Sequence, residues 1–156
     1  QPLAHSAEPD KEAERLISDY CARAGVTLIH QEGDKAFYRP SNDTIVLPMM
    51  SQFTETAEYY STAFHEMVHS TGHSNRLNRL TQTAHFGNEE YSKEELVAEI
   101  GASALVNHAG LETEKSFRNS TAYVQSWLNV LKNNKRFIVS ASGKAEKAVE
   151  LILAGA

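Results

Sequence analysis

The sequence predicts an α+β domain in which several helices pack with a small N-terminal antiparallel sheet of about three strands. Two observations lead to this prediction. Short apolar runs bounded by turn residues lie within residues 26–47, whereas the rest of the chain places apolar residues at helical spacing. With 156 residues, 41% of them hydrophobic, the chain is large enough to form one domain around a core of its own.

The N-terminal part is expected to form one helix and then the sheet. Residues 10–24 carry apolar side chains at helical spacing, and Gly25 is typical of a residue that ends a helix. Turn residues such as Gly33 separate three strand candidates, which favours an antiparallel meander. The strand candidates are residues 26–30, 35–39 and 44–47.

Two central helices are expected next. Residues 57–71 have helical spacing, with Thr54 as a capping residue and Gly72 as the residue that ends the helix. Ser92 begins a Ser-x-x-Glu sequence, which is typical of a capping box and predicts a helix over residues 93–108. The segment between these helices is rich in Asn, Thr and Gly and is expected to be irregular.

The C-terminal third is expected to form two more helices, over residues 120–133 and 144–153. Tyr123 and Trp127 lie on one face of the first of these and are assigned to the core. Residues 115–147 carry 7 basic side chains and 1 acidic side chain. This segment could contact a phosphate backbone, but no aromatic stacking platform accompanies it, so a solvated helical surface is the stronger interpretation.

Composition and charge disfavour several classes of protein. The 15 basic and 20 acidic side chains give a net charge of −5, which is a poor match to a dedicated nucleic-acid-binding protein. The apolar runs are far shorter than the roughly 20 residues that cross a bilayer, so no membrane contact is expected. Cys21 is the only cysteine and cannot form an internal disulfide, which favours a reducing compartment and a cytoplasmic location.

The chain begins with Gln1 rather than Met, which is typical of a fragment or a processed product. Residues 1–10 are small and polar and lack the basic start and apolar core of a secretory signal. We interpret residues 1–10 as a tail or linker from something upstream and residues 11–156 as the domain.

The most informative motif is His65-Glu66-Met67-Val68-His69. Two histidines four residues apart on a helix lie on one face, so both imidazoles can reach one ion. Zn²⁺ accepts neutral imidazole nitrogens and prefers tetrahedral coordination. Glu66 lies one position further round the helix, beside the ion, where a general base for a metal-bound water belongs. His65 and His69 are therefore predicted metal ligands.

A catalytic zinc site needs a third protein ligand, and three places after the motif are possible sources of it. A third histidine six residues after His69 would complete a known extension of the motif, but that position is Asn75. His73 lies just past the expected helix end, where the chain turns away. Glu95 and Glu99 are four residues apart on one helical face, so one can bind the metal and the other can orient a histidine. They could also belong to a solvated face.

A His-Glu-x-x-His motif followed by Glu-x-x-x-Glu on a later helix resembles the gluzincin clan of zinc metallopeptidases. The resemblance implies that Glu95 is the third zinc ligand. It also implies that the Glu99 carboxylate does not bind the metal but orients the ligand His65.

A closer resemblance covers roughly residues 12–154. Residues 59–73, 91–102 and 122–137 resemble the zincin-like metallopeptidase domain of ArdC-type plasmid antirestriction proteins, TraC proteins and phage polyvalent proteins. In those proteins a separate single-stranded-DNA-binding domain usually precedes this one. The resemblance therefore implies that DNA is contacted only through an N-terminal domain missing from this chain.

The motifs and the resemblance together predict zinc-dependent hydrolysis of a peptide bond in a protein or peptide substrate. Glu66 would take a proton from a zinc-activated water, and Tyr91 and His85 are candidate donors to the developing oxyanion. Two other functions stay open. One is a catalytically silent, zinc-stabilised protein-interaction module, and the other is a nucleic-acid accessory domain that uses the basic segment.

Overall fold

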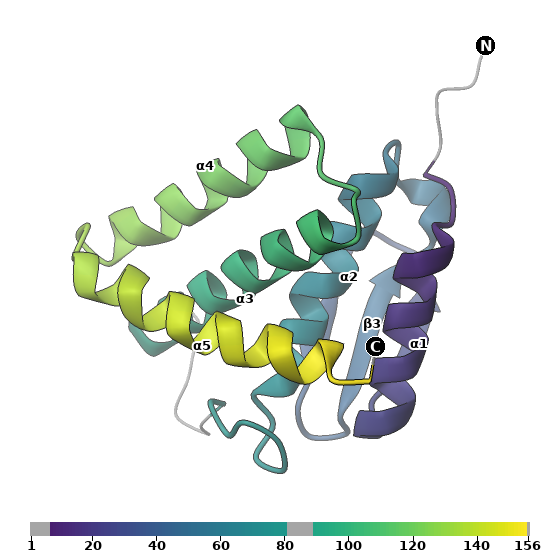
Figure 1. Cartoon of the computed structure of the whole chain (residues 1–156), viewed down its shortest axis with the longest axis horizontal. Helices are drawn as coiled ribbons and strands as arrows, with labels where there is room; N and C mark the ends of the chain where they lie inside the picture. The colour runs from purple at the N-terminus through teal and green to yellow at the C-terminus, as the bar shows by residue number, and fades with distance from the viewer. Residues whose placement is uncertain (1–6, 81–88, 156) are drawn as a thin grey trace.

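A computed structural model of the chain describes residues 7–80 and 89–155 and confirms the predicted α+β class. Helix α2 contacts strands β2 and β3 as well as helices α3 and α5, so it links the sheet to the helical part of the molecule (Figure 1). Within the described ranges, no helix combines the length and the apolar character needed to cross a membrane. The elements in chain order are α1 (Lys11–Ala24), β1 (Thr27–Gln31), β2 (Phe37–Arg39), β3 (Thr44–Pro48), the 3₁₀ turn η1 (Met50–Gln52), α2 (Thr56–Thr71), α3 (Glu89–His108), α4 (Glu114–Val130) and α5 (Lys135–Leu153).

The sheet has three strands, as predicted, but it is mixed, and the prediction of an antiparallel meander is wrong. The strand order is β1-β3-β2, with β3 parallel to β1 and antiparallel to β2. All five residues of β3 are buried. This burial agrees with its central position, because a central strand has a neighbouring strand at each edge. The mixed order makes β2 an edge strand of the sheet.

The first helix begins and ends where the sequence predicts. The Asp10 side chain accepts a hydrogen bond from the backbone N–H of Ala13 and caps α1, and Gly25 follows in the left-handed region at φ 77°. Residues 7–10, which belong to the expected tail, contact the domain. The backbone N–H of Ala7 donates to Phe53 O at 2.9 Å, and that of Asp10 donates to the Tyr60 hydroxyl at 2.9 Å.

The later helices begin earlier than predicted. Helix α2 is preceded by Glu55 without a side-chain cap, so Thr54 is not its capping residue. Helix α3 starts at Glu89, which places Ser92 inside the helix and buries it; the predicted capping box is therefore wrong. A capping box joins Thr113 and Ser116 at the start of α4.

The core assignment of Tyr123 is also wrong, since its side chain is 54% exposed. Helix α4 buries none of its own residues and packs against α3 through half-buried side chains such as Trp127. The core lies instead where α1, α2, α3 and α5 meet strand β3, which contributes Ile45 and Leu47. Its largest fully buried side chains include Tyr20, Tyr60, Phe64, Met67, Leu96, Leu105 and Ile152.

One glycine sets the distance between α2 and α3. A Cβ atom at Gly101 would lie 2.9 Å from Cγ2 and 3.2 Å from Cγ1 of Val68, which is closer than packed carbon atoms approach. Val68 is β-branched and fully buried, so it has little freedom to move aside. The absence of a side chain at Gly101 therefore permits the close packing of the two central helices.

We expect Gly101→Ala to destabilise the fold by about 1–3 kcal/mol through overpacking, despite the helix propensity that alanine gains. The measurement is urea unfolding of four variants. Gly143→Ala is the control, because a Cβ at Gly143 in α5 meets nothing within 4 Å, and it should stabilise the protein by up to about 1 kcal/mol. In a Val68→Ala background, Gly101→Ala should cost much less, and an equal cost in both backgrounds would contradict the close-approach argument.

Candidate metal centre

Helices α2 and α3 bring together two histidines and a glutamate that could hold a metal ion. One ligand atom each from His65, His69 and Glu95 lies within 4.8 Å of the other two. Nε2 of His65 lies 3.2 Å from Glu95 Oε1, and Nε2 of His69 lies 2.7 Å from Glu95 Oε2. All three side chains are mostly withdrawn from solvent, with exposed fractions between 12% and 15%. The geometry therefore places the three predicted ligands at one point.

Each imidazole is held from behind by a second carboxylate of α3. Nδ1 of His65 donates to Glu99 Oε1 at 3.2 Å, and Nδ1 of His69 donates to Glu94 Oε2 at 2.9 Å. A proton fixed on Nδ1 leaves Nε2 as the ligand nitrogen, so both rings present Nε2 towards Glu95. The structure thus brings Glu99 to His65, the histidine that the resemblance implies it orients.

The donor set fits a divalent transition metal. Two imidazole nitrogens and one carboxylate are the three protein ligands of many catalytic zinc sites, which keep a fourth position open. The same ligands also suit Mn²⁺, Co²⁺, Ni²⁺ and Fe²⁺, so the ligand types alone do not select zinc.

The carboxylates control the protonation of both histidines. Burial alone would lower the pKa of His65, but Glu95 and Glu99 outweigh it and raise the pKa to about 9. Burial likewise opposes protonation of His69, and Glu94 and Glu95 raise its pKa well above the ordinary value. Burial would raise the pKa of Glu95, yet its contacts with the two histidines lower it. Without a metal, the cluster therefore favours two imidazolium rings facing ionised carboxylates.

The site lies in a cleft of about 1220 Å³ that β2, α2, α3 and α4 line. Glu66 is 7% exposed and lines this cleft beside the two histidines. Burial raises the pKa of Glu66, and the neighbouring His69 and His65 offset part of that rise. A carboxylate with a raised pKa, next to a site suited to a metal, has the properties of a general base.

The structure brings one of the two predicted donors to the cleft. Tyr91 lines it, and its ring meets that of Trp127 edge to face with 5.8 Å between centroids. Burial, together with the charges of Glu95 and Glu66, raises the pKa of Tyr91 to about 12, so its hydroxyl keeps its proton. His85 lies outside the described residues. His73, an alternative third ligand, is not in the metal-binding group found among the described residues.

Sequence reasoning missed Glu94, Arg79 and Tyr123. Glu94 is adjacent to Glu95 and has no role in the predicted site, yet it accepts a hydrogen bond from His69 and is itself held by Arg79. The sequence does contain a signal for Glu94. Each of the two ligand histidines needs a hydrogen-bond partner for its second ring nitrogen, and Glu99 is the predicted partner of only one of them. Tyr123 lines the cleft instead of filling the core.

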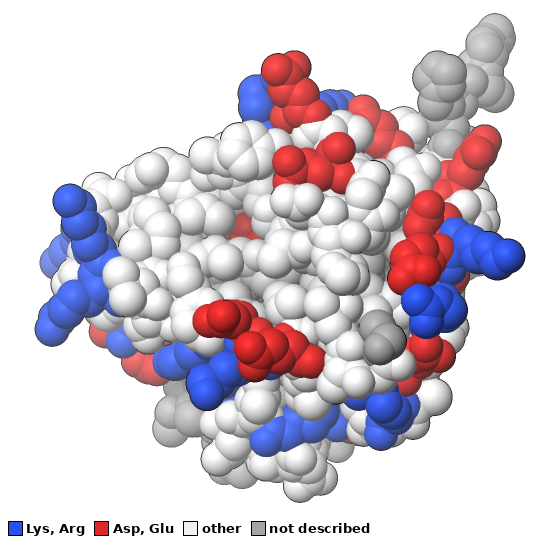
Figure 2. Space-filling view, viewed as in Figure 1, with Lys and Arg blue, Asp and Glu red and all other residues white. Residues whose placement is uncertain are grey.

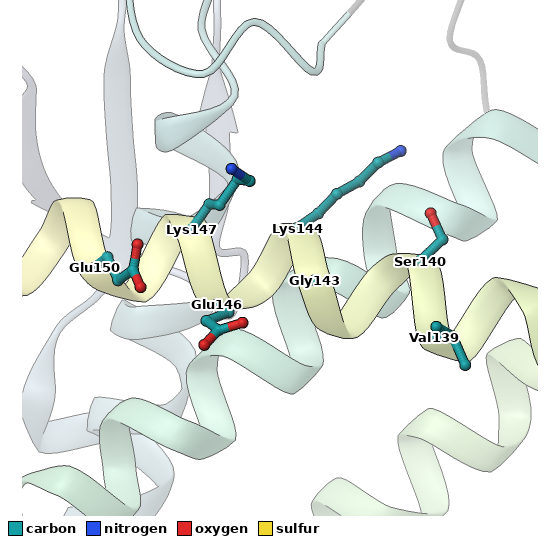
Figure 3. A pocket seen from close by; sticks show the side chains of 7 residues that line it. All are labelled: Val139, Ser140, Gly143, Lys144, Glu146, Lys147 and Glu150. Atoms are coloured by element: carbon teal, nitrogen blue, oxygen red, sulfur yellow. The ribbon is translucent and has the colours of Figure 1, made fainter.

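Two surface features lie apart from this centre. Lys and Arg side chains gather at the end of the molecule where α4 meets α5 (Figures 1 and 2), and Lys132, Lys135 and Arg136 of this turn are exposed. A second hollow lies along α5, and all seven residues that line it come from that one helix (Figure 3). It contains no histidine or cysteine, and its two acids, Glu146 and Glu150, are exposed and share the hollow with Lys144 and Lys147. It therefore offers no metal-ligand set like that of the cleft.

Comparisons with known proteins give a family and several relatives for this chain. A family model described as zincin-like metallopeptidase matches residues 11–144. The chain resembles two Escherichia coli proteins named DNA primase TraC, with 39% identity over 154 residues and 44% identity over 134 residues. These alignments cover 98% and 85% of this chain but only 10% and 12% of the TraC proteins. It is also 31% identical over 149 residues to the uncharacterized protein y4eC of Sinorhizobium fredii, covering 96% of this chain and 46% of that protein.

Two solved structures have the same fold. The crystal structure of the antirestriction protein ArdC from plasmid R388, in its Mn(II)-bound form, matches with a TM-score of 0.76 and 34% identity over 98% of this chain and 55% of that chain. Its metal-free structure matches with a TM-score of 0.71 and 34% identity over 96% and 52%. The fold and the site define an α+β domain suited to a divalent metal. The chain belongs to the zincin-like metallopeptidase family.

We expect Glu95→Ala to abolish stoichiometric metal binding, because it removes the ligand that both histidines face. Glu99→Gln keeps the size of the side chain but weakens the hydrogen bond that it accepts from Nδ1 of His65. The expected loss of metal affinity is about 10- to 100-fold. The measurement is competition with a chromophoric chelator. Glu112→Gln, in the loop before α4, is the control and should bind metal as the unchanged protein does. Full binding by Glu95→Ala would contradict the assignment of this ligand.

Metal affinity should rise with pH. The ion pairs of His65 stabilise the metal-free protein fully at pH values below 6.5, the ordinary pKa of histidine. This contribution is lost as the pH rises through about 9, the raised pKa of His65. A metal ion competes with protons on both imidazoles, so the apparent affinity should rise by up to about 100-fold per pH unit in the range where both are protonated. Calorimetry in buffers of different ionisation enthalpy counts the protons released. An affinity that stays flat above pH 6.5 would contradict the raised pKa.

Proposed function

We propose that this chain is a zinc-dependent peptidase domain that hydrolyses a peptide bond in a protein or peptide substrate. One observation carries the proposal. A buried glutamate, Glu66, lies between two histidines on one helix, beside Glu95 and within an open cleft. A site that only stabilises the fold needs closed coordination and has no use for a base of this kind.

The chain's own residues would perform four tasks. His65, His69 and Glu95 would hold the zinc ion, which supplies Lewis-acid polarisation of the scissile carbonyl and acidifies a bound water. Glu66 would accept the proton of the attacking water and deliver it to the departing amine. The Tyr91 hydroxyl, which keeps its proton up to about pH 12, would donate a hydrogen bond to the developing oxyanion. The edge-to-face contact with Trp127 of α4 would hold the Tyr91 ring in the cleft.

The cleft supports a peptide substrate rather than a small molecule. Its volume of about 1220 Å³ exceeds that of ordinary small-ligand pockets, and the edge strand β2 forms one of its walls. The chain spans a tenth of the TraC relatives and about half of the ArdC chain that it matches. We therefore propose it as the peptidase domain of an antirestriction-like protein of a mobile element, acting in the cytoplasm. Contact with DNA is assigned to a separate domain.

A catalytically silent metal-binding module is the second candidate function, and one substitution separates the two. Glu66→Gln preserves the shape and leaves the three ligands intact, so metal binding should persist while peptide cleavage falls by about 100- to 10,000-fold. The assay is mass-spectrometric detection of new termini in a peptide library incubated with the zinc-loaded protein.

Glu146→Gln on the exposed face of α5 is the control and should cleave as the unchanged protein does. Equal cleavage by Glu66→Gln would contradict its role as base. Absence of cleavage by the unchanged, zinc-loaded protein across the library would favour the silent module.

A further inference from the structure

A buried arginine lies directly behind the metal centre. The Arg79 side chain is 8% exposed and forms a double hydrogen bond with Glu94, from Nε to Oε1 at 3.0 Å and from a terminal nitrogen to Oε2 at 3.0 Å. The same guanidinium donates to the carbonyl of Val68 at 2.7 Å and to the hydroxyl of Thr71 at 2.8 Å. It therefore joins the last turn of α2 to the first half of α3.

Glu94 connects this arginine to the metal ligands. Its Oε2 accepts hydrogen bonds from both Arg79 and Nδ1 of His69. A carboxylate locked in a planar double hydrogen bond has one orientation, and so has the imidazole that donates to it.

A second observation shows that the chain makes room for this contact. Gly72 ends α2 with φ −82°, which any residue can adopt, so backbone freedom does not explain a glycine there. A Cβ at Gly72 would lie 2.9 Å from Cγ of Leu80 and 3.1 Å from a terminal nitrogen of Arg79. The glycine is needed for space, since a side chain there would force Leu80 to move and would shift the guanidinium by a few tenths of an ångström.

We propose that Arg79 is a positioning residue of the metal centre, which sets metal affinity through Glu94 and His69. Gly72 serves the same end by leaving space for the guanidinium. The proposal rests on the metal site described above, but it does not depend on peptide hydrolysis.

The neighbouring Arg76 separates this role from a merely structural one. Its side chain is 9% exposed and also donates to backbone carbonyls, those of Ser70 and Ala24, each at 2.9 Å. Its ion-pair partner is Asp43, which precedes β3, and none of these contacts involves a metal ligand. Both arginines stabilise the fold, and only Arg79 lies in the chain of hydrogen bonds that reaches His69.

The experiment measures the dissociation constants of Zn²⁺ and Mn²⁺ by chelator competition, together with the midpoint of thermal unfolding. Arg79→Met should lower both affinities about 10- to 100-fold, as loss of an outer-shell partner does. Arg76→Met should lower the unfolding midpoint yet leave both affinities within about threefold of the unchanged protein. The double variant Arg79→Met/Glu94→Gln should bind little worse than Glu94→Gln alone, because the two residues act in series.

Two milder variants cover the case in which Arg79→Met fails to fold. Arg79→Lys keeps the charge but loses the planar double contact, so an intermediate affinity is expected. Gly72→Ala keeps the arginine and displaces it, so a loss of several-fold is expected. Unchanged affinity in all folded Arg79 and Gly72 variants would overturn the proposal, as would an equal loss in Arg76→Met. Because no substrate is present, failure of the peptidase proposal would leave this result unaffected.

Discussion

The contact between α2 and α3 is the constraint on which the rest of this structure depends. Helix α2 supplies both histidines and the proposed base, and α3 supplies the three carboxylates that contact the histidines, those of Glu94, Glu95 and Glu99. Neither helix forms the centre alone. The contact of Gly101 with Val68 sets how closely the two helices approach. Metal ligands must be placed to within a fraction of an ångström, so the helix spacing affects metal binding as well as packing.

The same contact accounts for the burial of so many charges. Isolated carboxylates and imidazoles would resist removal from water, but here each histidine faces two carboxylates and Glu94 faces a guanidinium. Such a cluster adds little to stability relative to an apolar core of the same volume. Its value is that the hydrogen bonds select one orientation for each ring, which is the requirement of a preorganised metal site.

The metal-binding motif could be predicted from the sequence because its information is local. Residues His65, Glu66 and His69 share one helical turn, and the spacing of Glu95 and Glu99 puts both on one face. The strand order could not be predicted, since short turns fit a meander as well as the observed order, and the burial of β3 decides between them. Arg79 was missed because its partner is 15 residues away and only the folded helices bring the two together.

The most direct test of the metal centre is a crystal structure of the zinc-loaded protein, with diffraction data collected on both sides of the zinc absorption edge. We predict an anomalous peak bounded by Nε2 of His65, Nε2 of His69 and the Glu95 carboxylate, with one position open towards the cleft. A peak at other residues, or no peak in crystals grown with excess zinc, would contradict the assignment of the metal centre.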